Sequence, residues 1–94
     1  MRRFYTVEHD TVTEVIGKAY LMYPRVGEWY NALTWRLERD PYPNEAIQIA
    51  PDTFVVKSEN WNYAGFCIIT MIYTVNDREI CIEDIRFEAT RGRR

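Results

Sequence analysis

Residues 65–87 read GFCIITMIYTVNDREICIEDIRF and form the most apolar stretch of the chain. Its two runs, Phe66–Val75 and Glu79–Phe87, are rich in isoleucine, tyrosine, valine, phenylalanine and threonine, which suit a pleated sheet. Between the runs, Asn76-Asp77-Arg78 begins with two residues that tolerate a left-handed backbone. The stretch therefore predicts a long β-hairpin.

Side chains alternate between the two faces of such a hairpin. A turn centred on Asp77 would place a nearly all-apolar set in the core, namely Cys67, Ile69, Met71, Tyr73, Val75, Cys81, Glu83, Ile85 and Phe87. The opposite face would be open to water or a partner and would carry Phe66, Ile68, Thr70, Ile72, Thr74, Ile80, Ile82, Asp84 and Arg86. Glu83 does not fit the apolar set, which indicates either a β-bulge or a position at the sheet edge.

That register places Cys81 opposite Tyr73, Thr70 opposite Asp84 and Ile68 opposite Arg86. Cys67 would then lie far from Cys81 along the ladder, too far for a disulfide. Two free thiols agree with a reducing compartment. Because the N-terminus has no signal-peptide pattern and no apolar run is long enough to span a membrane, a cytoplasmic protein is expected.

Upstream of the hairpin, Phe4–Val7 predicts a short strand, and two apolar stripes at helical spacing follow it. The first stripe runs from Val12 to Tyr23 and is ended by Pro24; the second comprises Val26, Trp29, Tyr30, Leu33 and Leu37. Trp35 lies off the second stripe, so its indole is either a second packing surface or a partner-binding anchor. Two further strands are expected at Ala46–Ala50 and Phe54–Ser58.

This order predicts one α+β domain over residues 1–94, in which a helical hairpin packs on one face of a mostly antiparallel sheet. The basic residues near the C-terminus predict a solvated tail over 88–94. A hydrophobic fraction of 47% excludes a disordered chain, and a net charge of −2 gives no overall attraction to nucleic acid.

Few residues carry recognisable chemistry. One histidine and two distant cysteines supply no metal-site spacing, and His9 is expected in an exposed loop. Arg86, with Lys57 as a second cation, could hold a phosphate group, although a structural ion pair with Asp84 is the alternative. The exposed apolar positions expected at Ile68, Ile72, Ile80 and Ile82 indicate either a partner surface or a face covered by a terminal segment.

The whole pattern resembles the RelE/ParE superfamily of type II toxins. The resemblance covers nearly all of residues 4–87. It rests on a short first strand and a helical hairpin that ends at Leu37–Pro41, which is like L-x-R-D-P, and then on three further segments: Phe54–Lys57, Ile72–Val75 before the turn, and Ile82–Phe87 after it. It implies an α+β fold of this type, without a cofactor or metal. It also implies a cognate antitoxin as partner, and a homodimer is a further assembly that we consider.

Members that cut mRNA on the ribosome use basic residues on the open sheet face, and by position these match Arg86 and Lys57. Thr70 stands where an arginine is expected three residues before Tyr73, and no tyrosine or histidine follows Phe87. The resemblance therefore implies a ParE-like toxin that binds DNA gyrase, with an mRNA endonuclease or a non-toxic binding module as alternatives. The expected partner-binding residues are Ile68, Thr70, Ile72, Ile80, Ile82, Asp84 and Trp35.

Overall fold

A computed structural model describes residues 4–58 and 68–88. Its elements follow in the order β1 (Tyr5–Glu8), α1 (Asp10–Ala19), α2 (Val26–Arg39), β2 (Ile47–Ala50), β3 (Thr53–Lys57), β4 (Ile68–Asn76) and β5 (Glu79–Glu88). The α+β class and the expected order of helices and strands are both observed. The expected strand start at Phe66, Cys67 and residues 89–94 of the basic tail lie outside the described residues.

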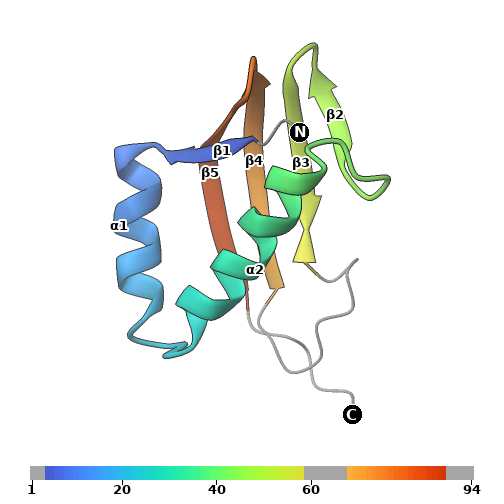
Figure 1. Cartoon of the computed structure of the whole chain (residues 1–94). Coiled ribbons are helices and arrows are strands. Elements are labelled where there is room, and N and C mark those ends of the chain that lie inside the picture. Colours follow the sequence, from blue (N-terminus) through green and yellow to red (C-terminus); the bar gives the residue numbers. More distant parts are fainter. Residues whose placement is uncertain (1–3, 59–67, 89–94) are drawn as a thin grey trace.

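The strands form one five-stranded sheet in the order β1-β5-β4-β3-β2 (Figure 1). β1 runs parallel to β5, and the other neighbouring pairs are antiparallel. The prediction of a mostly antiparallel sheet is therefore confirmed. The parallel pair arises because α1, α2 and three further strands separate β1 from β5 in the chain.

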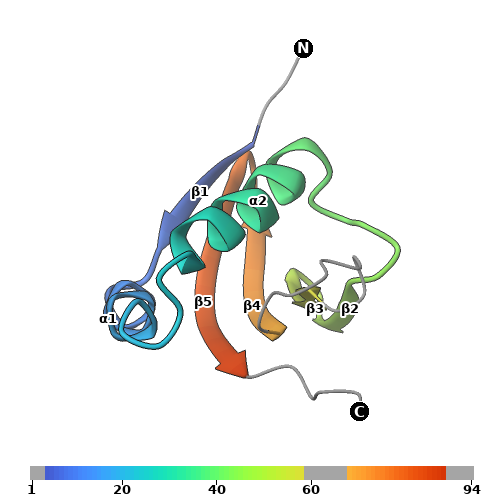
Figure 2. The same cartoon turned by 90° about the horizontal axis from the view of Figure 1, so that it is seen from below.

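α2 crosses in front of β4 and β5, and α1 lies beside β5 next to β1 (Figures 1 and 2). The buried side chains of both helices join those of the sheet in one apolar cluster, whose members are Val12, Ile16, Ala19, Val26, Trp29, Tyr30, Leu33, Leu37, Val56, Ile69, Met71, Tyr73, Val75, Ile80, Ile82 and Ile85. All of the second predicted stripe is buried. In the first stripe, by contrast, Tyr20 is exposed because α1 ends at Ala19, well before Pro24.

The hairpin turn is shorter than expected. Asn76 pairs directly with Glu79, so the turn consists of Asp77 and Arg78, and Asp77 takes a left-handed backbone with φ of 58°. This one-residue offset reverses the expected faces of the first half of β5. Ile80 and Ile82 are 0% exposed and belong to the core, whereas Cys81 is partly exposed and pairs with Thr74 rather than Tyr73.

A bulge at Glu83 then reverses the alternation again. Tyr73 pairs with Ile82 and the preceding Ile72 pairs with Asp84, so Glu83 has no partner in the ladder and its side chain is exposed. This is the first of the two explanations predicted for Glu83. Beyond the bulge the core and open positions agree with the prediction, but Thr70 lies opposite Arg86 and Ile68 opposite Glu88.

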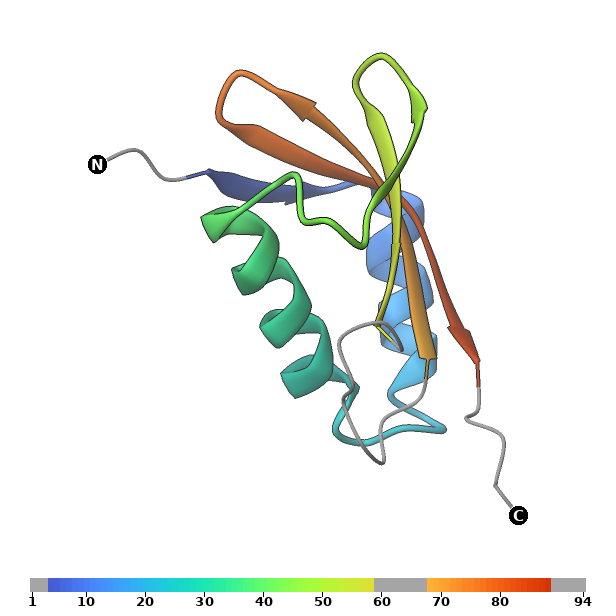
Figure 3. The same cartoon turned by 90° about the vertical axis from the view of Figure 1, so that its right-hand side faces the viewer.

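The sheet face away from α2 is the surface on which the site lies. In side view α2 stands on one side of β3 and β4, and no described element covers their other side (Figure 3). We call this surface the open face. None of the described helices is long and apolar enough to cross a membrane.

Candidate functional site

Two cations are brought together across three strands on the open face. Lys57 of β3 pairs with Thr70 of β4, and Thr70 pairs with Arg86 of β5. Directly paired residues place their side chains on the same face, about 5 Å apart. Lys57 and Arg86 therefore flank the Thr70 hydroxyl, although 29 positions separate them in the sequence.

The three residues line a shallow depression of about 270 Å³. Its other lining residues are Ile72, Asp84 and Glu88, so the walls carry two cations, two carboxylates, one hydroxyl and one apolar side chain. This depression contains both residues predicted as catalytic, and five of its six lining residues belong to the open face of the hairpin.

The predicted ion pair between Arg86 and Asp84 does not form. In the described part of the chain, ion pairs are found at Arg25–Glu28 and Arg36–Glu45, and none includes Lys57 or Arg86. The Asp84 carboxylate instead accepts a hydrogen bond from the backbone N–H of Ile85, at 2.9 Å. Both cations are thus available to an external anion, although Asp84 and Glu88 lower the positive potential around them.

An apolar row runs beside the cations. Ile47 of β2 pairs with Val55 of β3, Val55 pairs with Ile72 of β4, and Ile72 pairs with Asp84 of β5. Ile47 at the sheet edge is 63% exposed, and Val55 and Ile72 are half-buried. Sequence reasoning missed Ile47 and Val55, because their alignment with Ile72 depends on the pairing of β2, β3 and β4.

The predicted partner-binding residues therefore divide into three groups. Ile68, Thr70, Ile72 and Asp84 lie on the open face as expected. The prediction for Ile80 and Ile82 is wrong, since both side chains are fully buried in the core. Trp35 lies on α2 and is not part of the open face.

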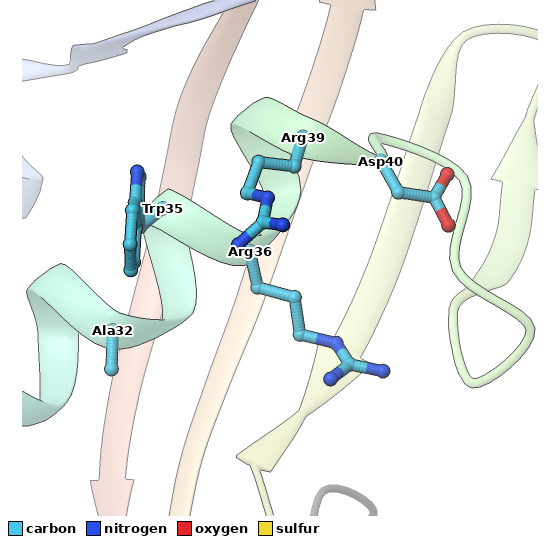
Figure 4. A pocket seen from close by; sticks show the side chains of 5 residues that line it. All are labelled: Ala32, Trp35, Arg36, Arg39 and Asp40. Carbon is cyan, nitrogen blue, oxygen red and sulfur yellow. The ribbon is translucent and has the colours of Figure 1, made fainter.

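Trp35 is 56% exposed and marks a second surface. The Arg39 guanidinium lies over its indole ring, with Cζ 5.3 Å from the ring centroid, a cation–π arrangement. A hollow of about 660 Å³ lies beside it and is lined by Ala32, Trp35, Arg36, Arg39 and Asp40. Figure 4 shows these five side chains. Arg39 follows Trp35 by four residues, so helical spacing could have revealed this contact.

The described residues offer little for acid–base or metal chemistry. No group of three or more histidine, cysteine, aspartate or glutamate side chains among them could hold a metal ion. His9 is exposed, as predicted, at the N-cap of α1. Burial, and then the neighbouring Glu83 carboxylate, raise the pKa of the Cys81 thiol, which makes its reactive thiolate rarer.

The arrangement can bind an anion or a mixed polar and apolar surface. Comparison of the chain with family models, with curated proteins and with solved structures finds no match.

Proposed function

We propose that this chain is a toxin domain of the RelE/ParE type that acts like ParE. It stops growth by binding a target protein such as DNA gyrase, and a cognate antitoxin neutralises it in the cytoplasm. The element order supports the proposal: a short strand and a helical hairpin precede the later strands, and all the strands form one sheet. This is the order on which the resemblance to the RelE/ParE superfamily rests.

The observation that carries the proposal is the make-up of the open face. The exposed or half-buried apolar side chains of Ile47, Val55, Ile68 and Ile72 form a surface beside the two cations. Protein-binding surfaces combine apolar contact area with a polar rim in this way. The same surface can seat an antitoxin segment, which would occlude it from the target.

Expression of the chain alone in bacteria tests the proposal. We expect growth to stop on induction, to recover when the cognate antitoxin is co-expressed, and the purified protein to inhibit supercoiling by DNA gyrase. Unchanged growth at a verified expression level would contradict the toxin proposal and leave a non-toxic binding module. Growth arrest with full gyrase activity would contradict gyrase as the target.

An mRNA endonuclease acting on the ribosome is the second candidate, and one observation favours it. Lys57 and Arg86 flank a hydroxyl on an uncovered surface and neither cation is in an ion pair with a described carboxylate. Two such cations could hold a backbone phosphate and stabilise charge that develops on it.

Primer extension on mRNA from induced cells separates the two candidates. Under the binding proposal no new cleavage ends appear, and Arg86→Ala still arrests growth. Arg78→Ala is the matched control, because Arg78 is an exposed arginine in the hairpin turn. If mRNA is cleaved by the wild type and by Arg78→Ala but not by Arg86→Ala, the binding proposal is contradicted and the endonuclease is the function.

A further inference from the structure

The outer surface of α2 carries a second, regular pattern. Glu28, Ala32, Trp35 and Arg39 follow one another at spacings of four, three and four residues. On a helical wheel they fall within an arc of about 60°, on the side opposite the buried stripe. Glu28, Trp35 and Arg39 are exposed and Ala32 is half-buried. We call these four residues the α2 seam.

Spacings of four and three are those of the positions that meet in a coiled coil. When two copies of α2 pack antiparallel about a twofold axis, the first seam residue of one copy lies opposite the last of the other. Glu28 then faces Arg39 of the second copy, and Ala32 faces its Trp35. The acidic end of each seam thus faces the basic end of the other copy's seam, and the large side chain of each copy faces the small side chain of the other.

The shape of the surface agrees with this pairing. Ala32 lines a hollow on each side of Trp35, one of about 660 Å³ with Arg36 and Arg39, and one of about 440 Å³ with Glu28 and Asn31. Figure 4 shows the Trp35 indole and the short Ala32 side chain extending from α2 in front of the sheet. A bulky indole beside a small residue is the arrangement in which a knob from one helix fills a hole in another.

The charged residues at the two ends of the seam make few interactions within the described part of the chain. The Glu28 Oε1 atom accepts from Arg25 at 3.0 Å, a pair in which both side chains are two-thirds exposed. Exposed pairs of this kind are weak, so Glu28 can also contact a second chain. Arg39 lies over Trp35 and forms no ion pair with any described carboxylate.

We propose that the chain forms a twofold homodimer through the α2 seam, independently of the function proposed for the open face. The occupant is a second copy because the seam is complementary to itself in charge and in side-chain size. One helix per copy buries less than the roughly 800 Å² per partner of a standard interface, so the dimer forms reversibly, with a dissociation constant in the micromolar range or weaker. The dimer would leave both open faces free.

Sedimentation equilibrium of the full chain over roughly a hundredfold range of concentration tests the proposal. We expect the average mass to rise with concentration from 11.3 kDa towards twice that value. Glu28→Arg and Arg39→Glu should each weaken the dimer by at least about tenfold, because like charges then face each other at both ends of the seam. Trp35→Ala should weaken it by a similar factor.

The decisive sample mixes the Glu28→Arg chain with the Arg39→Glu chain. In the mixed pair both ends of the seam again hold opposite charges, so we expect the mixture to associate at least about tenfold more tightly than either variant alone. Glu14→Arg, an exposed reversal on α1, is the control and should leave the dimer unchanged. The proposal would be overturned by a wild-type chain that stays monomeric, by a mixture that associates no better than either variant alone, or by a Trp35→Ala chain that dimerises as tightly as the wild type.

Discussion

At the scale of single residues, Tyr73 connects the sheet to the loop after α2. Its side chain is 0% exposed, its hydroxyl donates to the Pro41 carbonyl oxygen at 2.9 Å, and its ring stacks on Phe54 with centroids 5.7 Å apart. Tyr73→Phe leaves that carbonyl without its partner, so we expect a loss of about 1–2 kcal/mol in urea unfolding. Tyr42→Phe, at an exposed hydroxyl, is the control; an equal loss there would contradict the assignment.

The buried tyrosines also predict how stability depends on pH. Burial raises the pKa of Tyr73, assisted by Asp40, and it raises the pKa of Tyr30, assisted by Glu8 and Glu38. The unfolded chain then loses these protons near pH 10 while the folded chain keeps them, so stability is full below that pH and falls above it. Each group contributes a slope of about 1.4 kcal/mol per pH unit.

Urea unfolding of the wild type and of Tyr73→Phe at pH 8 to 11 measures this slope. The variant should lose stability less steeply above about pH 10, because one of the two titrating groups is absent. Parallel curves for the two proteins would show that the Tyr73 hydroxyl titrates alike in the folded and unfolded chains.

Ile82 tests which face of β5 lies in the core, because the sequence placed it on the open face and the structure places it in the core. Because its side chain is 0% exposed, Ile82→Ala should lower the free energy of unfolding by about 2–5 kcal/mol. Ile47→Ala, at an edge residue that is 63% exposed, should change it by less than about 0.5 kcal/mol. Similar losses of unfolding free energy for the two variants in chemical denaturation would show that Ile82 lies on the open face.

Among the secondary-structure elements, β5 carries a bulge that lets apolar side chains on both sides of it point into the same core. Ile82 and Ile85 are both buried although three positions separate them, which regular alternation forbids. Deletion of Glu83 would restore regular alternation and keep every observed pairing on either side of it. We therefore expect this deletion variant to fold, with a loss of no more than about 2 kcal/mol.

Deletion of Cys81, two positions before Glu83, is the matched comparison. It would bring Ile80 and Ile82 next to each other, so one of them must point away from the core, and we expect a loss above about 3 kcal/mol or no folded protein. Circular dichroism and urea unfolding of the two deletion variants measure the difference. Equal losses would contradict the position of the bulge.

At the scale of the whole molecule, much of the fold follows from periodicity. The apolar stripe from Val26 to Leu37 predicted the buried side of α2, and the run from Phe66 to Val75 predicted the buried side of β4 where it is described. The parallel pairing of β1 with β5 was not predicted, because it joins segments from opposite ends of the chain. Ile80 and Ile82 were predicted on the wrong face, because the turn is one residue shorter than the sequence predicted.

The open face was only partly predictable for a related reason. Sequence chemistry selected Lys57, Thr70 and Arg86, and the register places the three in one row. The apolar row from Ile47 through Val55 to Ile72 needs the pairing of β2 with β3, which a sequence of four weakly patterned residues does not specify. Local pattern thus selects residues, and strand pairing decides which of them share a surface.

Under the proposed function, the open face acts by binding a target protein through its apolar row, and its cations do not cleave RNA. Growth after induction of the wild type, Arg86→Ala and the double variant Ile47→Asp/Ile72→Thr, each verified as folded and expressed, tests it most directly. We expect the wild type and Arg86→Ala to arrest growth, and cells with the double variant to grow normally. Normal growth with Arg86→Ala and arrest with the double variant would contradict it.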